Sequence, residues 1–395
     1  MGEAPKLEET SEEVTQPEKE KIPSSLSLID KDESAGRLDK DAAWVLRFQR
    51  LFEPEKLPEK YQSPKPLKCG TPVFKAFNRE QDTLKPETID RLHPYLVRPD
   101  HPESIFNQEN KTRASQKSSS GYSNLLFADE VKRPEGFSTL DVSDKILLWY
   151  HEGNKGTAES ARHYLLNYDM YNRFVKIMKR EPPSDSHPAG DSRLDIYLVS
   201  DTAVDGDAGW CRPELGDSDS AANTPAASHI LINGNLSGDD LGAALAHELF
   251  HAFQHAWDAN EDDWWSEATA VWSEDFIDAG WDTEHEYIED AFSESDNSLI
   301  SLDDDGEDHS YGIYIFPYYL TKVRHPGNDL LIGQIWSSCE SQAALDAVES
   351  NMDADFKDVL KEFALLNYEE SLLPECSGGF QSYPEPLLFY PEHEA

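Results

Sequence analysis

The residues best suited to chemistry form one short stretch, His247-Glu248-Leu249-Phe250-His251. Residues four apart lie on one face of a helix, so the two imidazoles can bind a single metal ion together. Glu248 directly follows the first histidine, where its carboxylate can reach a metal-bound water and act as a general base. This spacing predicts metal-assisted hydrolysis, and the alternative is an amphipathic helix whose histidines face solvent.

The sequence also predicts the elements that must position these side chains. Ser237 and Asp240 form a capping pair at the expected start of a long helix. Apolar residues follow at helical spacing, namely Leu241, Ala244, Leu245, Leu249 and Ala252. Just upstream, the run His229-Ile230-Leu231-Ile232 predicts a short buried strand. A short strand that leads into a long helix is the arrangement in which we expect this motif to occur.

A catalytic zinc ion usually has three protein ligands and keeps one position open. The metzincin class has a histidine six residues after the second motif histidine, but this chain has Trp257 there, which excludes that class. Glu267 lies in an apolar helical stretch, where an unpaired carboxylate is costly to bury and a metal ion removes the cost. Glu274, about two turns further on, is the rival ligand on the same face. We expect Glu267 to be the third ligand. The alternative is that both glutamates lie on a solvated helix face.

These motifs resemble those of the gluzincin metallopeptidases, in which His-Glu-x-x-His is completed by a glutamate on a following helix. The stretch Trp265–Ala270 is similar to the Trp-x-Glu-Gly-x-Ala hallmark of hyicolysin-like bacterial secreted peptidases, with Ala268 in place of the glycine. Ala252-Phe253-Gln254 adds to the likeness, which covers roughly residues 140–370. The resemblance implies an α+β fold of the zincin, thermolysin-like type. Such a fold has a small mixed β-sheet with the zinc helix, followed by a mostly helical C-terminal subdomain.

The resemblance also implies a mechanism. His247, His251 and Glu267 would bind Zn²⁺, and Glu248 would take a proton from the attacking water and pass it to the leaving amine. We therefore expect a zinc endopeptidase that acts on peptides or proteins. The alternatives are a zinc aminopeptidase of narrow specificity, a self-processing hydrolase, or a non-catalytic surface or binding protein on a peptidase fold.

The oxyanion that develops during such a reaction needs a hydrogen-bond donor besides the metal ion. Tyr311 is the expected donor, because it follows a polar loop at the point where an apolar helix begins. His309 is the second candidate. A tyrosine that simply fills the core is the alternative interpretation of Tyr311.

The net charge of −42 is unevenly distributed: residues 181–395 contain only six Lys and Arg and carry −41, while residues 1–180 carry −1. Binding to nucleic acid or to anionic membranes is therefore not expected. No apolar run reaches the ~20 residues that a membrane-spanning helix needs. Adaptation to high salt is the preferred explanation of the acidity, ahead of a preference for cationic substrates. The run 303–308 could bind Ca²⁺, but it lacks EF-hand spacing and a solvated turn is expected.

Composition divides the chain into four parts. Residues 1–36 are expected to be a disordered acidic tail and residues 37–135 an N-terminal extension or propeptide-like segment with a helix at 42–52. Residues 136–375 are the expected zinc metallopeptidase domain, and residues 376–395 a C-terminal tail. Further strands are expected at 146–150 and 194–199, and further helices at 158–179, 312–322, 329–337, 343–351 and 356–366. The oligomeric state is left open.

The four cysteines, Cys69, Cys211, Cys339 and Cys376, are widely spaced. They are compatible with two disulfides in an exported protein or with four free thiols in a cytosolic one. The stretch Pro66–Pro72 resembles the cysteine switch of matrix metallopeptidase propeptides, in which a thiolate fills the open zinc position. A disulfide or a buried thiol is the preferred interpretation of Cys69. No signal peptide is visible, but the resemblance implies a secreted or cell-envelope protein; the alternative is the cytoplasm of a salt-loving organism.

Overall fold

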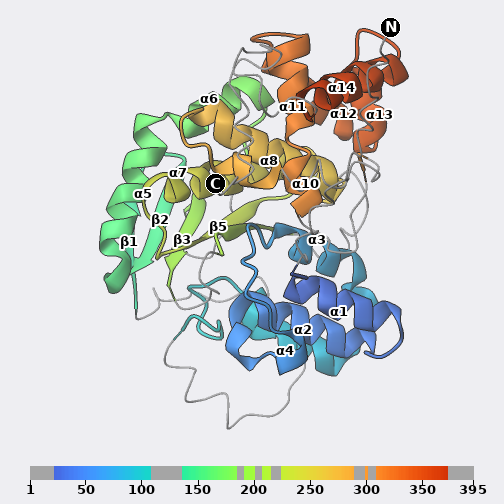
Figure 1. The fold of residues 1–395 in the computed structure, drawn as a ribbon. Coiled ribbons are helices and arrows are strands. Elements are labelled where there is room, and N and C mark those ends of the chain that lie inside the picture. Colours follow the sequence, from blue (N-terminus) through green and yellow to red (C-terminus); the bar gives the residue numbers. More distant parts are fainter. Residues whose placement is uncertain are drawn as a thin grey trace, which may run out of the picture.

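A five-stranded mixed β-sheet forms the centre of the protein, and helices lie on both of its faces (Figure 1). The α+β class expected from the sequence is thereby confirmed. The structure is a computed structural model that describes residues 22–107, 136–184, 191–200, 207–214, 224–288, 299–300 and 308–371.

The strand order in the sheet is β1-β2-β3-β5-β4. The strands are β1 (Phe137–Asp141), β2 (Ile146–His151), β3 (Leu194–Val199), β4 (Gly209–Pro213) and β5 (Ser228–Asn233). β2, β3 and β5 run parallel, whereas β1 and β4 pair antiparallel with their neighbours. β4 is therefore an edge strand, and it lies beside the strand that leads into the helix with the two histidines.

The central strands are mostly apolar and are buried along nearly their whole length, because helices cover both faces of the sheet. Along β2, Leu148 belongs to the core on the side of the histidine helix, while Leu147 and Trp149 belong to the core on the opposite side. β3 alternates in the same way, with Ile196 on the first side and Tyr197 on the second. This period of two matches the alternation of side chains along a strand.

Four helices from the N-terminal part of the chain cover one face of the sheet (Figure 1, blue). They are α1 (Ser25–Ser34), α2 (Lys40–Phe52), α3 (Thr71–Glu80) and α4 (Pro86–Leu96), with the short turns η1 (Pro54–Lys56), η2 (Glu59–Tyr61) and η3 (Gln81–Thr83). Aromatic side chains join this layer to the sheet: Phe52 and Phe74 pack on Trp210 of β4 at ring-centroid distances of 5.1 and 5.9 Å. The N-terminal layer is thus part of a core that it shares with the sheet.

One expectation for this part of the chain is wrong. Residues 25–34, expected in a disordered tail, form α1, because the Ser24 hydroxyl caps the helix and Leu26 and Ile29 are buried. The segment expected to be an N-terminal extension or propeptide-like segment also contains α3 and α4, whose apolar faces pack inward. Residues 1–21 and 108–135 lie outside the described residues.

The opposite face of the sheet is covered by η5 (Glu152–Asn154), α5 (Lys155–Asn167), α6 (Met170–Met178) and the long helix α7 (Gly238–His255). One helix was expected over residues 158–179, but Asp169 adopts a left-handed conformation with φ of 50° and separates α5 from α6. α7 begins after Ser237 as expected, although the Ser237 side chain makes no capping hydrogen bond.

Only helices follow α7 among the described residues: α8 (Asp263–Ile277), η6 (Thr283–Tyr287), α10 (Asp308–Gly312), α11 (Ile315–Tyr318), the π-helical turn η7 (Tyr319–Arg324), α12 (Leu330–Cys339), α13 (Ala344–Ser350) and α14 (Phe356–Ser371). The single helix expected at 312–322 is instead three short ones, with Pro317 inside α11. Residues 303–307 of the proposed calcium loop lie outside the described residues. Within the described part of the chain, no helix combines the length and apolar character needed to cross a membrane.

Candidate metal centre

Two packed helices bring the candidate ligands together. α7 contributes His247 and His251, whose ring centroids are 4.8 Å apart, and α8 contributes Glu267. All three side chains are buried, as is Glu248 between the histidines. The four-residue spacing on α7 places both imidazoles on the face that α8 covers, as the sequence predicted.

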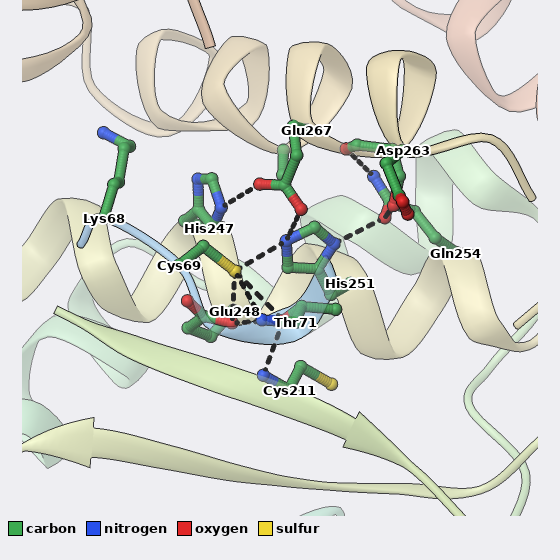
Figure 2. A network of polar contacts seen from close by, with 12 residues as sticks. Lys68, Cys69, Thr71, Cys211, His247, Glu248, His251, Gln254, Asp263 and Glu267 are labelled. Carbon is green, nitrogen blue, oxygen red and sulfur yellow. Dashed lines mark hydrogen bonds and ion pairs between the residues drawn. The ribbon is translucent and has the colours of Figure 1, made fainter. Parts of the chain in front are cut away.

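A fourth residue reaches the same point from the N-terminal layer. One potential ligand atom from each of Cys69, His247, His251 and Glu267 lies within 4.8 Å of the others. Glu267 Oε2 is 3.2 Å from His247 Nε2, and Glu267 Oε1 is 3.4 Å from His251 Nε2. Cys69 Sγ is 3.4 Å from His251 Nε2 (Figure 2). This group could hold a metal ion, because histidine, thiolate and carboxylate are all metal ligands.

The other nitrogen of each ring is held by a separate partner. His247 Nδ1 lies 2.8 Å from Glu274 Oε1, and His251 Nδ1 lies 2.7 Å from Gln254 Oε1. The Gln254 amide is itself oriented, since its Nε2 donates to the Ser266 carbonyl at 2.9 Å. Both Nδ1 atoms therefore act as donors to oxygen, which leaves the Nε2 lone pairs facing the cluster, as in metal-bound histidines.

The polarity of this cluster supports a cation. With both Nε2 lone pairs turned inward, the histidines face the Glu267 carboxylate oxygens at 3.2 and 3.4 Å, which is repulsive unless a proton or a cation lies between them. Burial lowers the pKa of His247, but hydrogen bonds with Glu267 and Glu274 outweigh it and raise the pKa to about 9. A proton on His247 would offset the repulsion only at that ring, whereas one metal ion could interact favourably with all the donor atoms of the group.

Glu248 stands at the side of the cluster. Its Oε2 is 3.6 Å from Cys69 Sγ and accepts a hydrogen bond from the Thr71 hydroxyl at 3.3 Å, while its Oε1 has no hydrogen-bond partner among the described residues. Burial raises the pKa of Glu248, and the two neighbouring histidines oppose that shift. A buried carboxylate with a raised pKa and a free oxygen has the properties of a general base.

A cavity of about 400 Å³ opens beside the cluster. Its lining includes His247, Glu248, Lys68 and Tyr311. The Tyr311 hydroxyl accepts from the Cys69 backbone N–H at 3.2 Å and donates to the Cys69 carbonyl at 3.4 Å. His309 is buried on the same short helix, α10, and is not part of the cavity lining.

The structure separates the two candidate glutamates by position. Glu267 faces the Nε2 atoms of both histidines, whereas Glu274 contacts only the Nδ1 atom of His247 and pairs with Lys68 at 3.0 Å. Glu267 thus lies on the Nε2 side of the His247 ring, toward the cluster, and Glu274 lies on the Nδ1 side. Gln254 and Thr71 were not identified from the sequence, although Gln254 follows His251 by three residues, a spacing at which helical side chains can meet.

The cysteines described by the structure, Cys69, Cys211 and Cys339, are buried free thiols, and Cys376 lies outside the described residues. Burial raises the pKa of the Cys69 thiol well above its ordinary value, and Glu248 and Glu267 add to the shift. A cation at the cluster would act in the opposite direction and favour the thiolate.

Comparison with known protein families and with curated proteins finds no match for this chain. The geometry and chemistry of the cluster are therefore the basis for inferring a function.

Proposed function

We propose that the protein is a zinc-dependent peptidase of the gluzincin type, with His247, His251 and Glu267 as metal ligands. The observation that carries this proposal is that both Nε2 atoms and the Glu267 carboxylate converge in a buried cluster, with Glu248 beside them at the edge of a cavity. The mixed donor set suits Zn²⁺, which accepts nitrogen, oxygen and sulfur ligands at tetrahedral sites. When bound, Zn²⁺ would supply Lewis acidity that polarises a peptide carbonyl and makes a water molecule more acidic.

The chain's own residues have separate roles in this proposal. Glu248 takes the proton of the attacking water with its Oε atoms and delivers it to the leaving amine. Glu274 and Gln254 hold the histidine rings so that Nε2 faces the metal position. Tyr311 donates a hydrogen bond from its hydroxyl to the developing oxyanion, a role consistent with its hydrogen bond to the Cys69 carbonyl at the cluster.

One observation favours a second candidate function. Cys69 completes a set of four protein donors, and four protein ligands with no open position are typical of structural zinc sites. A structural site has no use for a base, however, and Glu248 is buried against the same group at the edge of the cavity. We therefore favour a catalytic site with a fourth position that Cys69 can occupy.

The test compares zinc content and casein hydrolysis in the parent chain and in Glu248→Gln. Both proteins are also measured with Cys69→Ala, because the thiol lies at the fourth position. We expect one zinc ion per chain in every protein and a loss of hydrolysis of about 10²–10⁴-fold in Glu248→Gln. Glu286→Gln, an exposed change in the cavity lining, is the matched control. Equal hydrolysis with and without Glu248 would exclude the proposed mechanism, and absence of stoichiometric zinc would exclude the site.

A further inference from the structure

The segment that carries Cys69 runs along the free edge of the sheet. Cys69 forms a parallel bridge with Gly209, the first residue of β4. The Gly70 N–H donates to the Gly209 carbonyl at 2.9 Å, and the Ala208 N–H donates to the Leu67 carbonyl at 3.2 Å. Residues 67–70 therefore pair with the start of β4 through one isolated bridge, beside the cluster.

Edge strands present unpaired N–H and C=O groups, and they are the surfaces to which extended peptides add in β-augmentation. In this protein β5 covers one side of β4, so an extended substrate can pair only on the side where residues 67–70 now lie. The cluster and the cavity lie beside this same side, since Glu248 is 3.6 Å from Cys69 Sγ. The segment thus occupies the position that a substrate backbone would take.

Cys69 of the segment and Thr71, the first residue of α3, face the catalytic groups (Figure 2). Cys69 Sγ lies 3.4 Å from His251 Nε2, and the Thr71 hydroxyl binds both Glu248 Oε2 at 3.3 Å and the Cys211 N–H at 2.9 Å. Lys68 pairs with Glu274, the carboxylate that holds His247. Cys69, Lys68 and Thr71 therefore contact every group assigned to metal binding or proton transfer, either directly or through one intervening side chain.

Ion pairs hold the helices on either side of the segment to the acidic part of the chain. On α2, Arg50 pairs with Asp207 at 2.6 Å, and on α3, Lys75 pairs with Asp263 at 2.8 Å. α2 and α3 also cover Trp210 on the sheet, as described above. Removing these helices would expose that aromatic surface to water, so they are suited to remain docked while the short segment between them moves.

We propose that residues 67–70 are a built-in inhibitor of the site, with the Cys69 sulfur as the fourth metal ligand and the backbone in the substrate position on β4. This proposal rests on the proposed function, because it assigns a regulator to that metal site. Opening breaks the metal–sulfur bond, and the released thiolate takes a proton from solvent; no electrons are transferred. α2 and α3 stay on the sheet during opening. Regulation of the site therefore requires only a local movement, and the N-terminal layer is not removed.

The test uses Co²⁺ in place of zinc in the full chain, because cobalt reports its ligands by absorption. Visible d–d bands show that the site binds metal, and a near-ultraviolet charge-transfer band shows that a thiolate is among the ligands. We expect both bands in the parent protein and loss of only the charge-transfer band in Cys69→Ser. Cys339→Ser, which removes a buried thiol beside Glu261, is the matched control and should keep both bands.

Activity is the second readout. We expect the zinc form of Cys69→Ser to hydrolyse casein at least about tenfold faster than the parent, because an open form populated at a tenth or less limits the parent rate. Cys339→Ser should match the parent. An unchanged rate in Cys69→Ser, with the charge-transfer band present in the parent, would make Cys69 a structural ligand and overturn the inhibitory role.

The outcomes separate the two proposals. Visible bands without a charge-transfer band in the parent would overturn the role of Cys69 and leave the proposed function standing. Absence of visible bands would instead exclude the metal site itself. Should Cys69→Ser fail to fold, alkylation of the parent by iodoacetamide decides: we expect Cys69 to react at least about tenfold more slowly with cobalt bound than after chelation, since a ligated thiolate is not free to attack. Equal rates would overturn the proposal.

Discussion

Glu274 Oε1 lies 2.8 Å from His247 Nδ1, on the side of the ring that faces away from the metal-ligand cluster. Glu274 is completely buried, and it also pairs with Lys68 and accepts from the Thr283 hydroxyl at 2.9 Å. A buried carboxylate that accepts the Nδ1 proton fixes the tautomer and the orientation of the imidazole. Glu274, the rival candidate ligand in the sequence, therefore orients the ring of His247, which is itself a candidate ligand.

We expect Glu274→Gln to weaken zinc binding by about 10–100-fold, the usual effect of losing the partner that orients a metal-bound histidine. The amide keeps an oxygen that can accept from His247 but removes the negative charge that strengthens the ligand. Competition with a chromophoric chelator measures the affinity. Glu286→Gln, an exposed change on the cavity lining, should bind zinc as the parent does. Equal affinities for both variants would show that the Glu274 contact does not support metal binding.

Tyr311→Phe tests the proposed oxyanion donor. Loss of one such donor typically lowers kcat by about 10²–10³-fold, while zinc binding should be unchanged because Tyr311 is not among the ligands. We would measure kcat in the Cys69→Ser background. In that background we expect the segment to be open, so that the Tyr311 hydroxyl is not held by the backbone of residue 69. Tyr314→Phe, another buried tyrosine whose hydroxyl has no hydrogen-bond partner among the described residues, is the control. Comparable kcat values for the two variants would leave Tyr311 as a packing residue.

The helix that carries His247 and His251 and much of the sheet could be predicted because their signals are local. The spacing of His247 and His251 places them on one helical face whatever surrounds the helix, and the apolar runs of β2, β3 and β5 mark buried strands. Glu267 was identifiable for a similar reason, as a single acid inside an apolar helical stretch. In each case the neighbouring residues determine the environment.

The remaining parts of the site depend on contacts between distant residues. Cys69 and His251 are 182 residues apart, so no local pattern indicates that they meet. β4 contains Gly209 and Pro213, residue types that weaken a strand prediction, and it is ordered by pairing with β5 and by packing of Trp210 on the N-terminal helices. Tertiary contacts, rather than local preference, determine these elements.

The packing of the N-terminal layer could not be predicted from the sequence for a related reason. Residues 37–135 were expected to form an N-terminal extension or propeptide-like segment, and in the structure Arg50 and Lys75 of this segment are buried against acids of the other half of the chain. Their burial becomes favourable only when Asp207 and Asp263 are in place, because an unpaired buried charge is costly. The strong acidity of residues 181–395 is thus partly offset by bases from the N-terminal part.

Arg50→Met tests how strongly this pairing holds the segment beside β4. Asp207 accepts from Arg50 through both carboxylate oxygens and from the Leu67 N–H at 2.5 Å. Methionine would leave Asp207 buried without its cation, so we expect a loss of about 3–5 kcal/mol in the free energy of unfolding, measured in urea. Lys40 lies on the same helix as Arg50, and Lys40→Met breaks its exposed pair with Glu80 of α3. This change should lower the free energy of unfolding by less than about 1 kcal/mol. Losses of similar size in both variants would show that the Arg50 pair contributes no more than a surface pair.

Glu284 gives the protein a specific dependence of stability on pH. Burial raises its pKa from the ordinary 4.5 to about 8, and the nearby carboxylates of Glu274 and Asp275 add to the shift. Between these two values the folded state keeps the proton and the unfolded state releases it, so stability falls as pH rises from 4.5 to 8, by at most about 1.4 kcal/mol per pH unit. Glu284→Gln removes this dependence, because the amide stays neutral. We therefore expect the variant to gain stability over the parent progressively across this range in urea unfolding, with Glu286→Gln following the parent. A constant difference between Glu284→Gln and the parent at pH 5 and pH 8 would mean that Glu284 is ionised in the folded protein throughout.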